Sequence, residues 1–199
     1  MIPKLDFRKF KHKGALSILV LLGLIFTFLM ITKKPTYTLK TKTAVTADQT
    51  YSDLILLPDL NPSTNFHAHF EFNILKQHRK INPNPWESLW FFWSYQKQTG
   101  DNKNTNYLVF KTNGLELGKA FGITDQTFLW TTDIVHFEIG KSYIVDMDFT
   151  NDILQIRINN LLFTPPAILK NTFLTGGNIG LYSEDADVQI KDYVFDFIK

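Results

Sequence analysis

The chain has 199 residues, of which 44% are hydrophobic and 20% are charged, so it can bury the core of one ordinary domain but hardly of two. It contains no cysteine, which excludes disulfides, thiolate catalysis, cysteine-based zinc sites and cysteine lipidation. The net charge is only +2 and the basic residues crowd the first 13 positions, so a nucleic-acid partner is not expected.

Residues 14–32 form an apolar stretch without a single charge. A helix that rises about 1.5 Å per residue needs about 20 such residues to cross a hydrocarbon layer ~30 Å thick. A cleaved signal peptide is the alternative, but its apolar part usually has about 7–15 residues and ends at a small-residue cleavage site, whereas Lys33, Lys34 and Pro35 follow here. We therefore expect an uncleaved transmembrane signal-anchor helix at 14–32.

Positive charge predicts how this helix is oriented. Five basic residues lie in the segment 1–13, against four between residues 33 and 42. The positive-inside rule then places 1–13 in the cytoplasm and the rest of the chain outside the membrane, in the periplasm or at the cell surface. The polar, threonine-rich segment 33–50 is interpreted as a spacer or a first edge strand, and 51–199 as one folded domain.

Beyond residue 50, hydrophobic residues recur with the period of two that is typical of strands, and no helical period recurs. The clearest strand is 66–74, in which one face holds Phe66, Ala68, Phe70, Phe72 and Ile74 and the other holds His67, His69, Glu71 and Asn73. Further strands are expected at 105–112, 127–132, 135–140, 142–149, 153–159, 177–183 and 188–198, separated by turn-forming residues. This succession predicts an all-β, antiparallel sandwich or barrel.

The segment 86–96 is unusual because both of its faces would carry rings if it formed one strand. One face would hold Leu89, Phe91, Trp93 and Tyr95 with Glu87, and the other would hold Trp86, Ser88, Trp90, Phe92 and Ser94. A solvated face does not tolerate so many rings, so the strand is expected to be central, with one side buried and the other lining a groove. The alternative is that both sides are covered.

Three stretches, 106–121, 137–163 and 176–197, resemble the concanavalin A-like lectin and glucanase superfamily. In the second, Gly-Lys and an aromatic residue open a strand that turns at Asn-Asp into a strand ending in an Asn turn. The third is similar to the family's Gly-x-Ile-Gly-Leu strand followed by Val-x-Ile-x-Asp-Tyr, which 3-keto-disaccharide hydrolase domains also show. The resemblance implies a two-sheet antiparallel jelly roll over 51–199, but such folds host lectins, hydrolases and lyases alike.

Catalytic residues are harder to find. Glucanases of this superfamily carry Glu-x-Asp-x-x-Glu, whose carboxylates serve as acid and nucleophile, and no glutamate of the chain begins that pattern. If the protein is a glycoside hydrolase or polysaccharide lyase, the candidates for acid and base are Glu87, Glu71 and His67. Glu87 stands among rings, where burial would raise its pKa and suit a general acid, although a water-exposed glutamate at a strand entrance is the more frequent case.

Two clusters raise the question of a metal. His67, His69 and Glu71 project from one strand face, where they could converge on a metal, transfer protons, contact a glycan, or simply be polar residues facing water. Calcium is the second case: the resemblance allows a structural Ca²⁺, and the oxygen ligands that it would need are offered by Glu184, Asp185, Asp187 and Asp192. An acidic loop in water explains the same residues, and no other cofactor is expected.

The favoured hypothesis is a membrane-anchored, extracytoplasmic domain that binds a carbohydrate or another surface polymer without catalysis. Rings stack on sugar faces and polar groups fix the hydroxyls, so the expected ligand-binding residues are Trp86, Trp90, Trp93, Tyr107, Lys111, His67, His69 and Glu71. The first alternative is the glycan-active enzyme. The second is a scaffold for envelope proteins, whose rings would bury against a partner chain.

Overall fold

The computed structural model describes residues 37–40, 52–57, 65–98, 103–122, 124–166, 169 and 172–197. The transmembrane helix expected at 14–32 lies outside these ranges. Within them, no helix has the length and apolar character needed to span a bilayer.

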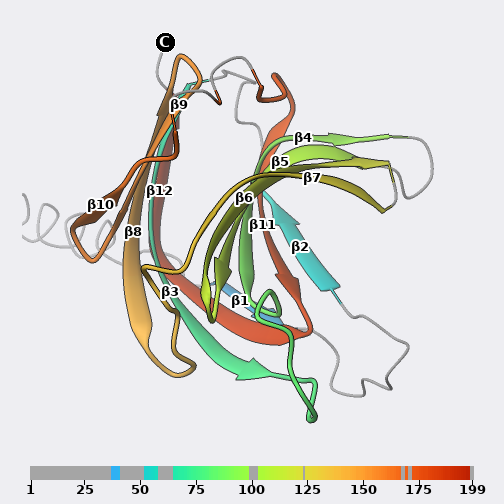
Figure 1. Ribbon diagram of the computed structural model, residues 1–199, viewed down its shortest axis with the longest axis vertical. Coiled ribbons are helices and arrows are strands. Elements are labelled where there is room, and N and C mark those ends of the chain that lie inside the picture. The colour runs from blue at the N-terminus through green and yellow to red at the C-terminus, as the bar shows by residue number, and fades with distance from the viewer. Residues whose placement is uncertain are drawn as a thin grey trace, which may run out of the picture. The chain divides into compact units, whose positions relative to one another are not determined.

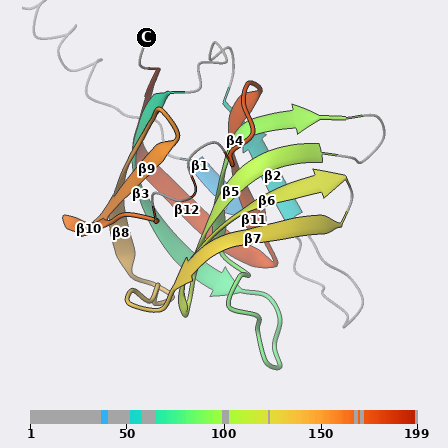
Figure 2. The same cartoon turned by 45° about the horizontal axis from the view of Figure 1, so that its top comes forward.

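The described residues form two six-stranded sheets that face each other (Figures 1 and 2). Sheet A runs in the order β1 (Tyr37–Lys40), β12 (Ala186–Phe197), β3 (Phe66–Gln77), β8 (Ser142–Thr150), β9 (Ile153–Ile158) and β10 (Leu161–Phe163). Sheet B runs in the order β2 (Ser52–Leu56), β11 (Asn178–Glu184), β4 (Leu89–Lys97), β5 (Lys103–Lys111), β6 (Gly114–Gly122) and β7 (Asp125–Thr132). Neighbouring strands are antiparallel, which confirms the predicted two-sheet sandwich.

The hydrophobic core lies between the sheets and is rich in phenylalanine. The five residues assigned to the inner face of 66–74 are all buried, as alternation predicted. Phe70 of β3 stacks on Phe91 of β4 with ring centroids 5.9 Å apart, and it meets Phe110 of β5 edge-on at 5.8 Å. Burying each such side chain contributes about 1.5–3 kcal/mol, so these contacts hold the two sheets together.

Two tight turns fix the register of β8, β9 and β10. Asn151 and Asp152 have φ angles of 52° and 62°, and Asn159 and Asn160 have φ angles of 49° and 70°. Two consecutive residues with positive φ make the turn that matches the twist of a hairpin, and Asn and Asp tolerate that conformation best after glycine. The turns expected at these positions are therefore confirmed.

The strand expected at 135–140 is wrong, because this segment forms an irregular connection between β7 and β8. Its alternation reflects one buried side chain, Phe137, which packs edge-on against Tyr143 at 4.9 Å. The Tyr143 hydroxyl satisfies backbone groups that a neighbouring strand would otherwise bind. It accepts a hydrogen bond from the Glu138 N–H at 2.9 Å and donates one to the His136 carbonyl at 3.2 Å.

Strand β4 begins at Leu89, later than the sequence suggested, and its alternation breaks once. The register with β5 shifts between Trp93 and Gln96, and Ser94 has a φ of 55°. This bulge inserts one residue into the period of two, so Tyr95 shares a cluster with Trp90 and not with Trp93. The expected placement of Tyr95 beside Trp93 is thereby corrected.

Candidate functional site

A second apolar cluster covers the outer face of sheet B, on the side away from the core. Its buried members are Trp90, Phe92, Tyr95, Tyr107, Val109 and Ala120. Tyr107 needs a glycine beneath it, because a Cβ on Gly118 would lie 2.3 Å from the tyrosine oxygen and 2.7 Å from the Thr127 carbonyl oxygen. The cluster gives this face a rigid aromatic floor.

A cavity of about 350 Å³ opens beside this floor. Its aromatic lining consists of Trp86, Trp90 and Phe128, and its polar lining consists of Glu116, Thr124, Gln126 and Glu184. Trp86 is 41% exposed and Phe128 is 68% exposed, whereas Trp90 is buried. Both exposed rings are therefore available to a ligand, in a cavity at the lower end of the ~300–1,000 Å³ typical of small-molecule sites.

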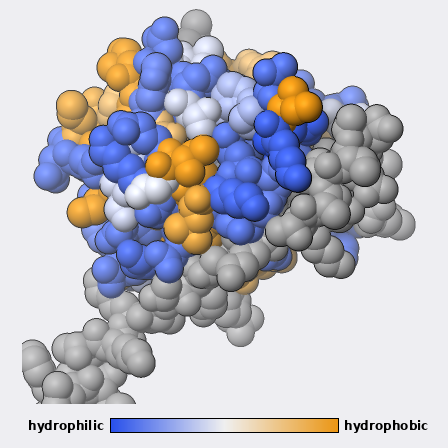
Figure 3. Space-filling model, turned by 90° about the horizontal axis from the view of Figure 1, so that it is seen from below, coloured by the Kyte–Doolittle hydropathy of each residue, from blue (hydrophilic) through white to orange (hydrophobic). Residues whose placement is uncertain are grey.

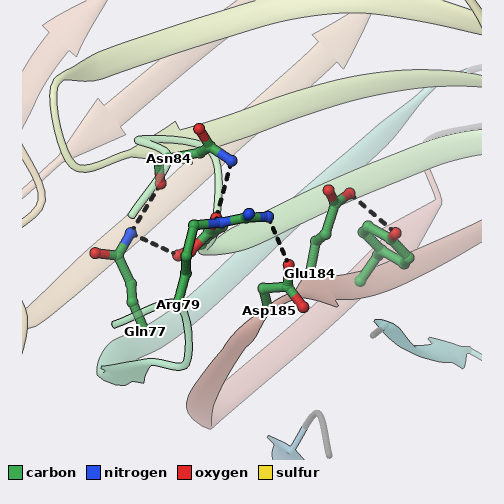
Figure 4. Close-up of polar contacts among 7 residues, drawn as sticks. Gln77, Arg79, Asn84, Glu184 and Asp185 are labelled. Atoms are coloured by element: carbon green, nitrogen blue, oxygen red, sulfur yellow. Dashed lines mark hydrogen bonds and ion pairs between the residues drawn. The ribbon is translucent and has the colours of Figure 1, made fainter. Parts of the chain in front are cut away.

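Each of the two carboxylates in the lining has a defined partner. Glu116 accepts a hydrogen bond from the Lys111 ammonium at 2.9 Å, and Glu184 accepts one from the Tyr182 hydroxyl at 3.1 Å, the latter drawn in Figure 4. Burial raises the pKa of both Tyr107 and Tyr182, and the nearby carboxylates, Glu116 and Glu184 respectively, raise it further. Both tyrosines therefore remain neutral at physiological pH.

The loop 78–88, which carries Trp86, is held by a buried ion cluster (Figure 4). Arg79 donates from Nε to Glu87 Oε1 at 2.5 Å and from Nη2 to Asp185 Oδ2 at 3.3 Å. Asn84 Nδ2 donates to the same oxygen of Glu87 at 2.9 Å. The side chains of Glu87 and Asp185 are completely buried. The hydrogen bond to Glu87 raises the pKa of Arg79, against a smaller opposing effect of burial. The guanidinium group of Arg79 therefore stays positively charged between the two carboxylates.

Further hydrogen bonds fix the backbone on either side of the Trp86 ring. The Trp90 indole N–H donates to the Trp86 carbonyl at 2.9 Å, and Gln77 Nε2 donates to the Glu87 carbonyl at 3.0 Å. Glu87 is therefore a structural anchor for the loop, enclosed on the side of Arg79. Sequence reasoning singled out Glu87, considered Asp185 only as a calcium ligand, and missed Arg79; their pairing was not predicted because Asp185 lies 98 residues after Glu87.

Comparison with known proteins agrees with this architecture. No family model matches the chain, and no curated protein matches it in sequence. Among solved structures, the carbohydrate-binding module CBM66 from Bacillus subtilis is 13% identical, with a TM-score of 0.55, and the match covers 83% of this chain and 97% of the module. The exoplasmic/lumenal domain of VIP36, in its Ca²⁺- and mannose-bound form, is 10% identical, with a TM-score of 0.52 and coverage of 82% and 83%.

This chain has the concanavalin A-like jelly-roll fold. The jelly-roll fold that the resemblance implied is thereby confirmed. At such low identities the likeness extends to the fold alone, so the roles of individual residues depend on where this jelly roll places them.

Trp93 faces the core between the two sheets, whereas Trp90, which was expected to share its site, faces the outer side of sheet B. Trp93 is 2% exposed and lies in the core, with its ring centroid 5.7 Å from those of Phe149 and Phe173. Successive strand residues point to opposite faces, so Trp93 and Trp90 cannot serve one groove. Tyr107 lies beneath the outer face and is fully buried, and Lys111 contributes by holding Glu116.

The jelly roll also places His67, His69 and Glu71 on the outer face of sheet A, opposite the cavity. His67 Nδ1 lies 2.8 Å from Asp148 Oδ1, and His69 Nδ1 lies 2.7 Å from Asp146 Oδ1. Glu71 pairs with Lys191 at 3.3 Å. Side chains on β3 thus form cross-strand pairs with β8 and β12 and do not join the tryptophans.

The structure does not bring together the acidic residues that were considered as calcium ligands. Asp185 pairs with Arg79, and Asp187 Oδ1 lies 2.8 Å from His78 Nε2. Asp192 lies where the register of β12 with β3 shifts, and its φ is 47°. In the part of the chain that the structure describes, no three His, Asp or Glu side chains converge in a way that could hold a metal ion.

Four cavity residues were not expected from the sequence: Glu116, Thr124, Gln126 and Phe128. Phe128 was assigned to the strand 127–132, in which alternation would pair it with Trp130 on one face. A bulge between Leu117 and Gly118 shifts the register, so that Phe128 is exposed while Trp130 packs against the core. A bulge of this kind leaves no reliable signal in the sequence.

Proposed function

We propose that this protein binds a carbohydrate, or another surface polymer, without cutting it, through the cavity on the outer face of sheet B. The observation that carries the proposal is the pair of exposed rings, Trp86 and Phe128, beside two carboxylates in one cavity. Aromatic faces stack on the apolar faces of sugars, while carboxylates and amides accept hydrogen bonds from hydroxyls. The names of the two similar structures, a carbohydrate-binding module and a mannose-bound domain, support the same class of ligand.

The binding residues of this proposal differ from those first expected. Trp86 and Phe128 stack on the ligand, Trp90 forms the floor, and Glu116 and Glu184 contact hydroxyls. Tyr107 and Lys111 support the floor and Glu116 from behind. The polar residues on β3 belong to the other face of the sandwich and have no part in this site.

The two alternatives have less support. An enzyme that uses Glu87, Glu71 or His67 would need these groups at a ligand, yet Glu87 is fully buried against Arg79 and the other two lie on sheet A. A scaffold would need a large apolar surface; on the one face that Figure 3 shows, the apolar patches of the described residues are separated by hydrophilic side chains. Release of cleavage products from a bound glycan would support the enzyme hypothesis, and failure to bind any glycan would favour the scaffold hypothesis.

The test is a screen of the full chain, purified in detergent, on a glycan array with and without Ca²⁺, followed by calorimetry of each hit. We expect Trp86→Ala and Phe128→Ala each to weaken binding roughly tenfold, because each removes a stacking ring. The control is Ile134→Ala, which truncates a residue that is 81% exposed and lies outside the cavity. Unchanged affinity in both ring variants would refute the assignment of the site.

We also propose that residues 14–32 anchor the protein in the cell membrane, with the jelly roll outside the cytoplasm. The support is the uncharged apolar stretch and the basic segment that precedes it. The full chain should stay in the membrane pellet after an alkaline wash, and protease added to intact cells or spheroplasts should digest the jelly roll. Release of the full-length chain by the wash would contradict the anchor, and protection from protease would contradict the orientation.

A further inference from the structure

The lining of the cavity combines aromatic rings with negative charge. Three rings, Trp86, Trp90 and Phe128, surround the same space as the carboxylates of Glu116 and Glu184. The Lys111 ammonium that contacts Glu116 is itself only 14% exposed and is not among the lining residues, so in the described part of the chain the charged groups that line the cavity are acidic.

Two tyrosines next to the cavity lie close to its carboxylates. Besides burial, which is the larger effect, Glu116 raises the pKa of Tyr107 and Glu184 raises the pKa of Tyr182. The carboxylates thus make it harder to place a negative charge on either hydroxyl. The same field favours a positive charge nearby, since the interaction changes sign with the charge.

Rings and carboxylates together suit one kind of ligand group. A cation over an aromatic face is attracted by the ring quadrupole, most strongly for tryptophan, and a carboxylate adds a charge-assisted hydrogen bond to an ammonium group. A neutral hydroxyl gains only the ordinary hydrogen bond, and an acidic sugar would be repelled by Glu184, whereas the Lys111 ammonium offsets part of the charge of Glu116. The lining therefore distinguishes sugars by the charge of their substituents.

We infer that the ligand carries a protonated amine, as in a polysaccharide that contains hexosamine units without their acetyl groups. This inference rests on the proposed glycan-binding function of the same cavity. The sugar ring stacks on an exposed ring, Trp86 or Phe128, and the ammonium group lies toward Glu184 and Glu116. Binding then depends on both shape and charge.

The test compares three β-1,4-linked oligosaccharides of equal length that differ only at C2 of each sugar, with an ammonium, an N-acetyl group or a hydroxyl. Their affinities for the full chain in detergent are measured by calorimetry in a mildly acidic buffer. We expect the amine form to bind about tenfold tighter than the hydroxyl form, and this preference to shrink as salt is added. Equal binding of the three forms, or a preference for either uncharged form, would overturn the inference.

A variant separates the charge effect from the general capacity to bind. Glu184→Gln keeps the shape of the side chain and an acceptor for Tyr182, so it should weaken binding of the amine form much more than binding of the hydroxyl form, and most of the preference for the amine should be lost. Glu138→Gln is the matched control, because Glu138 is exposed on the connection before β8 and does not line the cavity. An undiminished amine preference in Glu184→Gln would also overturn the inference.

These outcomes are distinct from failure of the proposed function. Binding of all three forms with equal affinity that is lost in Trp86→Ala would keep the glycan site and refute only the amine. If none of the three forms binds, the inference is refuted, and hits on the glycan array decide separately whether the cavity binds another sugar.

Discussion

At the scale of single residues, Glu87 shows how burial changes the role of a carboxylate. Its position among rings made it a candidate acid, but its side chain is completely buried and receives hydrogen bonds from Arg79 and Asn84. Three charged groups meet there, since Asp185, from a distant part of the sequence, completes the cluster with Arg79 and Glu87. Such a group contributes to function indirectly, through the loop that presents Trp86.

Removing the carboxylate should therefore destabilise the fold. Glu87→Ala leaves the Arg79 Nε and the Asn84 amide without their acceptor, while Asp185 still pairs with Arg79, so the loss should reach at most the ~3–5 kcal/mol of unfolding free energy that breaking a fully buried pair costs. Glu87→Gln retains an acceptor and should cost less. Urea unfolding measures both, with Glu138→Ala as the control, because Glu138 pairs with Lys141 in contact with solvent and its removal should change stability little. A loss in Glu87→Ala no larger than in this control would show that the cluster is not structural.

At the scale of secondary structure, alternation and turn chemistry predicted most strands and the sandwich class. They succeeded at β3, where the polar and apolar faces are unbroken, and at the Asn turns, where the chemistry of positive φ is local. They failed where one residue is inserted, as at Ser94, because a bulge reverses every later assignment without a marker in the sequence. They also failed at 135–140, where a single buried phenylalanine imitated a strand.

The site was only partly predictable for a related reason. Alternation indicates which side chains share a face of one strand, but it does not indicate which strands are neighbours. Trp86 and Trp90 were found, since they lie close together in the sequence. Phe128 and Glu184 reach the same cavity from β7 and β11, and their approach depends on sheet order. The polar face of β3 was joined to the same groove although it belongs to the other sheet.

At the scale of the whole domain, the two sheets present outer faces of different chemistry. Sheet B carries the aromatic floor and the cavity. The strands β3, β8 and β12 of sheet A carry cross-strand polar pairs, which include the hydrogen bond of His67 with Asp148 and the ion pair of Glu71 with Lys191. Pairs that are this exposed are individually weak, so the charged face adds little to the free energy of unfolding at neutral pH. Its main effect is to make that free energy depend on pH.

The carboxylates of this charged face should make the domain sensitive to acid. Burial would raise the pKa of Asp148, but hydrogen bonds from His67 and Arg157 outweigh it and hold the pKa below its ordinary 3.8. A hydrogen bond from Ser142 and the pairing with Lys191 hold the pKa of Glu71 below its ordinary 4.5, against a smaller effect of burial. Because both pKa values are lower in the folded state, their contribution is fully present above the unfolded values and is lost as the pH falls through the folded ones.

The expected result is measurable in the double variant Asp148→Asn, Glu71→Gln. Solvent screening limits each pair to about 0.2–1 kcal/mol, so the variant should be less stable than the wild type by roughly 1 kcal/mol at neutral pH. Below the folded pKa values the two proteins should converge, because protonation has already removed the same interactions from the wild type. Urea unfolding at a series of pH values gives both curves, with Asp133→Asn, an exposed carboxylate after β7, as the control. A difference between wild type and variant that persists unchanged into strong acid would mean that these ion pairs are not its source.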